Sequence, residues 1–233
     1  MKEHGGPFSL NPPKLVIFDF DGTLAETEVV AARLISDRLA ALGSHQSPAD
    51  IAATLSGVSR ARERELLEDL TGLSLNDTFF DDIYEAWREA MLSGVSPTPG
   101  TVEVLEGLTV PFCVASNSSR KDLILRMKSA GIFNLIGSRF FSSHDIGLHK
   151  PDPAVFLLAA EAMGVAPADC VVIEDSTTGL EAAHRAGMRC CAFVGAAHQS
   201  ERMYAALEGC RPDAVLTKMS DLLRLVQGRV TPH

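Results

Sequence analysis

Long apolar runs and an excess of positive charge are both missing from this sequence. No stretch approaches the roughly 18 apolar residues that a membrane-spanning helix needs. The formal net charge is -9, from 21 Lys and Arg against 30 Asp and Glu. An acidic chain of this kind has little general affinity for nucleic acid or anionic membranes. We therefore expect neither a nucleic acid nor a membrane as partner.

A CxxC motif is also missing. The chain has five cysteines without a CxxC spacing, so the sequence gives no support for a metal-binding or redox pair. Cys113, Cys190 and Cys191 lie in short apolar runs, where a buried thiol behaves as a small hydrophobe. Residues 1–13 lack the apolar segment of a secretory signal, and we interpret them as a flexible N-terminal lead-in. These features favour a cytoplasmic protein, and we expect a monomer.

Short, uniformly apolar runs are present instead, and they predict buried strands. Strands that are covered on both faces are apolar throughout rather than alternating. Patterns typical of helices separate the later runs, and this order of elements predicts a parallel sheet in an α/β fold. The predicted strands are residues 15–18, 111–115, 139–142, 170–173, 190–194 and 214–216.

One region interrupts the alternation. From about residue 28 to residue 95 no convincing strand is found, and residues 31–42, 60–70 and 77–92 have helical patterns. Residues 93–100 have the composition of a linker. The sequence therefore predicts a helical module, residues 28–97, inserted into a core that comprises residues 14–27 and 98–233.

Polar and charged residues follow four of the predicted strands. In a parallel sheet, ligands bind at the carboxyl ends of the strands, so these residues are expected at one edge. In chain order they are Asp19, Asp21, Ser116, Asn117, Lys150, Glu174 and Asp175.

Each piece alone has an ordinary explanation. The run from Asp19 to Gly22 is compatible with a turn, Lys150 with the solvated start of a helix, and Glu174-Asp175 with a helix cap. Their joint occurrence at successive strand ends favours a functional site.

The acidic residues fit a magnesium-dependent reaction on a small phosphorylated metabolite. Asp19, Glu174 and Asp175 are hard oxygen donors suited to Mg²⁺. Asp19 would also attack phosphorus, and an aspartyl-phosphate would divide one difficult transfer into two easier steps. Asp21 would protonate the leaving oxygen and later deprotonate water.

The remaining polar residues would hold the transferring group. Lys150 would neutralise its charge, and the Ser116 hydroxyl with nearby backbone N–H groups would hold its oxygens. We expect Asp19, Asp21, Ser116 and Lys150 to be catalytic.

These short motifs resemble those of the haloacid dehalogenase-like (HAD) superfamily over roughly residues 14–220. The matching runs are Asp19-Phe20-Asp21-Gly22-Thr23-Leu24, Ser116-Asn117, Lys150-Pro151 and Glu174-Asp175. The run from Glu174 to Ala183, and the later Ala186-Gly187-Met188, are similar to the beta-phosphoglucomutase-like branch. The resemblance implies a Rossmann-like core and an α-helical cap that closes over the site. It also implies that the backbone carbonyl of Asp21 binds Mg²⁺.

The resemblance leaves the choice between a phosphatase and a sugar phosphomutase open. Asp21 and the Glu174-Asp175 pair argue against dehalogenation. Residues 57–60 are similar to a phosphomutase cap motif, which makes Arg60 a candidate substrate contact beside Gly22 and Asn117. The mutases carry a histidine after the first motif, and residues 19–42 contain none. We therefore favour a phosphatase that acts on a sugar phosphate or sugar-acid phosphate.

Two further alternatives come from other classes of protein. A signalling receiver domain also phosphorylates an aspartate, but it has no helical insertion after the nucleophile strand. A catalytically inactive binding protein is opposed by the intact acidic set. We expect the cap to move about two chain crossings, near residues 25–28 and 96–99.

Overall fold

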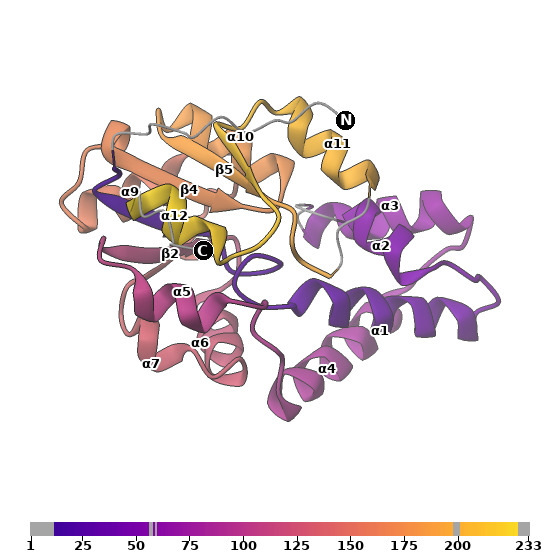
Figure 1. Ribbon diagram of the computed structural model, residues 1–233. Coiled ribbons are helices and arrows are strands. Elements are labelled where there is room, and N and C mark those ends of the chain that lie inside the picture. Colours follow the sequence, from indigo (N-terminus) through magenta and orange to yellow (C-terminus); the bar gives the residue numbers. More distant parts are fainter. Residues whose placement is uncertain (1–11, 56–57, 59, 198–200, 228–233) are drawn as a thin grey trace, which may run out of the picture.

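The architecture is a six-stranded parallel sheet with helices on both faces, as the sequence predicts (Figure 1). The computed structural model describes residues 12–55, 58, 60–197 and 201–227, and it leaves out the side chains of residues 60–61, 201–203 and 227. The strand order is β3-β2-β1-β4-β5-β6. The strands are β1 (Leu15–Phe18), β2 (Phe112–Ser116), β3 (Phe140–Ser142), β4 (Cys170–Glu174), β5 (Arg189–Phe193) and β6 (Ala214–Leu216).

Strand β1 lies in the middle of the sheet and has no exposed residue. Val16 and Phe18 face a cluster that contains residues of α5, α6 and α12, whereas Leu15 and Ile17 face a cluster with residues of α9 and α10. This explains why the strand sequences are apolar throughout. These helices are α5 (Thr101–Gly107), α6 (Arg120–Ser129), α9 (Ala154–Ala162), α10 (Thr177–Arg185) and α12 (Asp221–Gln227).

Shorter helices complete the core. They are α7 (Phe133–Ile136), α8 (Ser143–Ile146), the 3₁₀ turn Pro167–Asp169 and α11 (Glu201–Gly209). Within the part of the chain that the structure describes, no helix is both long and apolar enough to cross a membrane.

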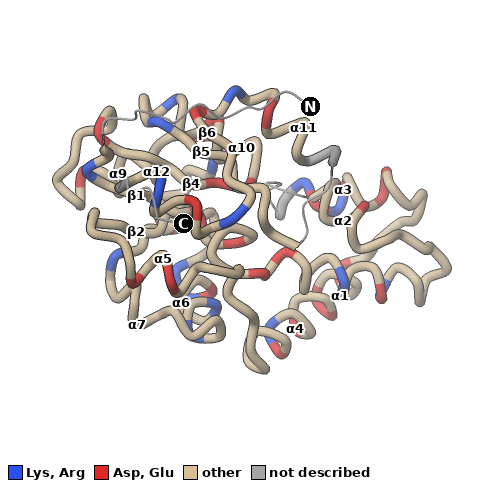
Figure 2. The backbone as a smooth tube through the Cα atoms, in the orientation of Figure 1, with Lys and Arg blue, Asp and Glu red and all other residues tan. Residues whose placement is uncertain are grey.

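Four helices between β1 and β2 form the cap: α1 (Thr27–Ala41), α2 (Pro48–Leu55), α3 (Arg60–Thr71) and α4 (Asp77–Ser93). The cap has an apolar cluster of its own, in which Leu39, Ile51 and Leu67 are fully buried. Acidic and basic residues are interspersed along its helices, as Figure 2 shows. The sequence prediction missed α2, whose eight residues are too few to show a clear helical period.

The two chain crossings between core and cap lie side by side. The N–H of Glu26 donates to the carbonyl of Ser96 at 3.1 Å, and the N–H of Thr98 donates to the carbonyl of Leu24 at 3.0 Å. Residues Trp87 and Met91, near the end of α4, belong to the same apolar cluster as Val16 and Phe18 of β1. The cap is thus anchored to the core through α4, and its movement about the crossings stays a prediction.

Candidate active site

The carboxyl ends of the strands bring the predicted residues together. Asp19 directly follows β1, Glu174 ends β4, and Asp175 comes next. Each of these three side chains can offer one carboxylate oxygen such that the three oxygens lie within 4.8 Å of one another. Ser116 ends β2, and Lys150 lies on the segment between α8 and α9. All five residues are buried, with exposed fractions of 8 % or less.

Lys150 is bound between two of the carboxylates. Its Nζ donates to Oδ1 of Asp19 at 2.5 Å, to Oε1 of Glu174 at 2.7 Å, and to the carbonyl of Ala115 at 2.9 Å. Burial lowers the pKa of Lys150, but the charges of Asp19 and Glu174 outweigh burial and raise it above its ordinary value. The ammonium group therefore stays charged at neutral pH.

The environment of Asp19 opposes its negative charge. Burial raises the pKa of Asp19 well above the ordinary value of an aspartate; Lys150 lowers it, and Glu174 and Asp175 raise it further. One ammonium group offsets the repulsion among these carboxylates only in part. Additional positive charge at this position would stabilise Asp19 in its ionised form.

The amino end of α10 fixes the acidic pair. Oε2 of Glu174 accepts hydrogen bonds of 2.9 Å from both the backbone N–H and the hydroxyl of Ser176, which is the N-cap residue of α10. The hydroxyl of Thr23 donates to Oδ1 of Asp175 at 3.0 Å. Gly179 lies so close to Glu174 that a Cβ there would be 1.8 Å from Oε1. The carboxylate of Glu174 occupies the space that a side chain at residue 179 would need.

The donor set fits a hard divalent cation. Three buried carboxylates against one ammonium group leave a formal charge of about −2, which would repel the dianion of a phosphate ester. Mg²⁺ binds to one or two carboxylates together with waters and phosphate oxygens. Asp19, Glu174 and Asp175 are the side chains that could hold it, and the carbonyl of Asp21 stays the fourth predicted ligand.

Asp21 has a separate set of hydrogen-bond partners. Oδ1 accepts from the hydroxyl of Thr27 at 2.6 Å, and Oδ2 accepts from the hydroxyl of Ser118 at 2.9 Å. Oδ2 also accepts from Nη1 of Arg126, with which it forms an ion pair. No sequence motif includes Arg126, because it reaches Asp21 only through the packing of α6 onto the core. An arginine within a helix gives by itself no sequence signal of such a contact.

The three predicted substrate contacts are placed differently. The amide oxygen of Asn117 accepts from the hydroxyl of Ser143 at 2.7 Å and from the N–H of Lys150 at 2.9 Å, so Asn117 also holds the Lys150 segment. Gly22 adopts φ +77°, and its N–H donates to the carbonyl of Ala25 at 2.9 Å. The side chain of Arg60 lies outside the described residues. Contact of all three with substrate stays a prediction.

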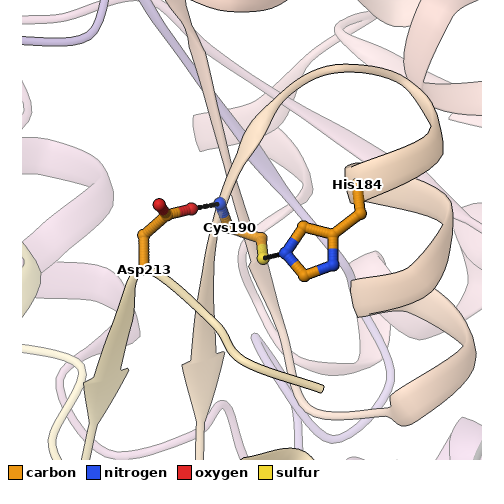
Figure 3. A group of neighbouring side chains, drawn as sticks. All are labelled: His184, Cys190 and Asp213. Atoms are coloured by element: carbon orange, nitrogen blue, oxygen red, sulfur yellow. Dashed lines mark hydrogen bonds between the residues drawn. The ribbon is translucent and has the colours of Figure 1, made fainter.

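A second group of possible metal ligands lies near the opposite, amino-terminal edge of the sheet (Figure 3). Sγ of Cys190 and Nε2 of His184 share a hydrogen bond of 3.1 Å, and Oδ2 of Asp213 accepts from the N–H of Cys190 at 2.8 Å. Burial raises the pKa of the Cys190 thiol to about 12. The two hydrogen bonds join α10, β5 and the start of β6, so this group has a structural role without a metal.

Comparison with known proteins identifies the family. The haloacid dehalogenase-like hydrolase family matches residues 13–187. The 6-phosphogluconate phosphatase of Escherichia coli is 28 % identical over 184 residues, which cover 78 % of this chain and 83 % of that protein. The fructose-1-phosphate phosphatase of E. coli is 31 % identical over 178 residues, covering 74 % and 92 %.

Solved structures agree with this assignment. A haloacid dehalogenase-like protein of unknown function from Agrobacterium tumefaciens has a TM-score of 0.86 at 29 % identity, covering 92 % of this chain and 98 % of its own. A HAD family hydrolase from Deinococcus radiodurans, solved with phosphate and sodium, has a TM-score of 0.83 at 31 % identity, covering 95 % and 99 %. The chain therefore belongs to the haloacid dehalogenase-like hydrolase family, as a phosphatase of that family.

Proposed function

We propose that this protein is a Mg²⁺-dependent phosphatase that hydrolyses a small sugar phosphate or sugar-acid phosphate through an aspartyl-phosphate on Asp19. The observation that carries the proposal is the buried Asp19 carboxylate, bound to Lys150 at 2.5 Å and close to Glu174 and Asp175. The names of the relatives support the substrate class, because they include phosphatases of 6-phosphogluconate, of fructose 1-phosphate and of phosphorylated carbohydrates.

The first half of the reaction transfers the phosphoryl group to the protein. An oxygen of Asp19 attacks phosphorus, and the bond between phosphorus and the ester oxygen of the sugar breaks. Asp21 donates a proton to that ester oxygen, so that the sugar leaves as an alcohol. Lys150 and the Ser116 hydroxyl stabilise the negative charge on the transferring oxygens. Mg²⁺ bound by Asp19, Glu174 and Asp175 would supply positive charge that lets the two anions approach each other.

The second half returns the enzyme to its starting state. Asp21, now a carboxylate, takes a proton from a water molecule, which attacks phosphorus. The bond between Asp19 and phosphorus breaks, inorganic phosphate leaves, and Asp19 is again a carboxylate. The hydrogen bonds from Thr27 and Ser118 hold Asp21 for both proton transfers.

Phosphate release from a panel of sugar phosphates and sugar-acid phosphates tests the proposal. We expect release that requires both Mg²⁺ and Asp19, so that a chelator or Asp19→Asn abolishes it. Asp21→Asn should still permit phosphorylation of Asp19 by an ester with a good leaving group, but slow the hydrolysis of the intermediate. Interconversion of sugar phosphate isomers without phosphate release would instead indicate the phosphomutase alternative. A cytoplasmic location and a monomeric state stay predictions.

A further inference from the structure

Arg126 connects the proposed acid/base residue with the cap. Its Nη1 donates to Asp21 and, at 2.7 Å, to the hydroxyl of Ser118. Its guanidinium carbon lies 4.4 Å from the centroid of the Trp87 ring. Arg126 belongs to α6 of the core, whereas Trp87 belongs to α4 of the cap, and these two helices pack against each other. One side chain therefore contacts both the site and the cap.

The environment strengthens both contacts. The side chains of Arg126 and Asp21 are only 17 % and 14 % exposed, and Trp87 is 8 % exposed. Ion pairs and cation–π contacts are stronger where water is largely excluded. Displacing the Trp87 ring would thus change the position of Arg126, and with it the hydrogen bond to Asp21.

Arg139 offers a comparison, because it makes a similar cation–π contact but, among the described residues, donates to backbone carbonyls alone. Its guanidinium carbon lies 4.3 Å from the centroid of the Phe112 ring, and its other groups donate to the backbone carbonyls of Leu135 and Ile136. Arg126 donates instead to two side chains of the site, and its own Nε is buried without a hydrogen-bond partner among the described residues. Arg126 thus differs from Arg139 in that it binds side chains of the site.

We infer that Arg126 is a positioning residue that holds the Asp21 carboxylate for proton transfer and makes its placement depend on the cap through Trp87. The inference rests on the proposed function, in which Asp21 moves the proton. It predicts that proton transfer is efficient only while α4 lies against α6. Asp19 and Lys150 belong to the core alone, so their arrangement would not depend on this contact.

Fluorescence tests the link without any measurement of activity. Trp87 is the single tryptophan of the chain, so its emission reports on this contact. We expect Asp21→Asn to change the Trp87 emission spectrum, and the same substitution to have no effect in an Arg126→Met background. Arg139→Met is the matched control, in which the effect of Asp21→Asn should persist. An equal effect of Asp21→Asn with and without Arg126, or no effect in either, would overturn the inference.

Kinetics test the positioning role. An aryl phosphate such as p-nitrophenyl phosphate has a leaving group that needs little protonation, whereas a sugar does need it. In rapid-quench experiments we expect Arg126→Met to slow phosphorylation of Asp19 by the sugar phosphate about 100-fold. The step should slow by less than about threefold with the aryl phosphate, because no proton transfer limits it. Arg126→Lys should recover part of the loss, and Trp87→Leu should show the same split between substrates.

The outcomes separate the inference from the proposed function. Equal losses with both substrates, or losses as large in Arg139→Met, would assign Arg126 to folding only and overturn the positioning role. If the unmodified protein released no phosphate from either ester, the proposed function would fail, and the fluorescence comparison would still decide whether Arg126 links Asp21 to the cap. Thermal unfolding of each variant establishes that it is folded. If Arg126→Met does not fold, Arg126→Lys replaces it in the fluorescence comparison, and Arg126→Lys and Trp87→Leu replace it in the kinetic comparison.

Discussion

Replacing Gly179 by alanine should impair the metal site, although helix propensity alone predicts a gain in stability. Gly179 lies in the first turn of α10, where alanine is favoured over glycine by about 1 kcal/mol in an unconstrained helix. In this fold the added Cβ would lie 1.8 Å from Oε1 and 1.9 Å from Cδ of Glu174. Real Cβ atoms essentially never approach a heavy atom more closely than 3.0 Å.

The size of the displacement determines the expected effect. Moving Oε1 of Glu174 from 1.8 Å to 3.0 Å requires a shift of 1.2 Å, either of the carboxylate or of the backbone of α10. Distances between a metal and its ligands tolerate only about 0.2 Å. The shift would also disturb the 2.7 Å hydrogen bond from Lys150. We therefore expect the Mg²⁺ concentration for half-maximal activity to rise by about 10–100-fold, and the free energy of unfolding to fall by about 1–3 kcal/mol.

Mg²⁺ titration of phosphate release and chemical unfolding measure the two effects. Gly209→Ala is a suitable control, because a Cβ there would meet no atom within 4 Å. The control should keep the Mg²⁺ dependence of the unmodified protein. A Gly179→Ala protein that is as stable and as Mg²⁺-sensitive as the control would refute the assignment of Glu174 to the metal site.

Three other perturbations have defined outcomes. Lys150→Met leaves the buried carboxylates of Asp19 and Glu174 without their ion-pair partner, so the free energy of unfolding should fall by about 3–5 kcal/mol. An unchanged midpoint of chemical unfolding would contradict these ion pairs. Asn117→Leu removes the acceptor for the backbone N–H of Lys150, so chemical unfolding should show that the free energy of unfolding falls by about 1–3 kcal/mol. An unchanged free energy of unfolding would contradict this. Burial raises the pKa of Cys113 and of Cys190 to about 12, so at pH 8 both thiols are almost entirely protonated. Iodoacetamide should therefore react first with the partly exposed Cys210, and mass spectrometry showing Cys113 labelled first would contradict this.

The same thiols give a pH dependence of stability. Because the folded pKa of Cys113 is raised, folding retains a proton that the unfolded chain loses above its ordinary thiol pKa of about 8.5. The contribution to stability is thus complete below that pH and decreases as the pH rises towards 12. Unfolding at pH 7 and pH 10 should show the decrease, and Cys113→Ala should reduce its slope.

The strands and the core of the site were predictable because their sequence signals are local. Each strand is a run of apolar residues, and Asp19 and Asp175 directly follow two of these runs, β1 and β4. Lys150 lies farther along the chain, on the segment between α8 and α9. Helix α2 was missed because it is short. Arg126 and the contact of Thr23 with Asp175 were missed because they join elements whose packing no local pattern encodes.

Lys150 and Arg126, two cations that the structure describes at the site, contact different parts of the molecule. This difference bears on which chemical steps require the cap. Lys150 contacts Asp19, Glu174 and the carbonyl of Ala115, all of which belong to the parallel sheet or directly follow its strands. Arg126 contacts Asp21 on one side and Trp87 of the cap on the other. If Arg126 acts as proposed, the nucleophile is ready whatever the position of the cap, whereas the acid/base residue is in place only when α4 is docked. Protonation of the sugar oxygen and activation of water then both require the docked cap, because Asp21 performs both.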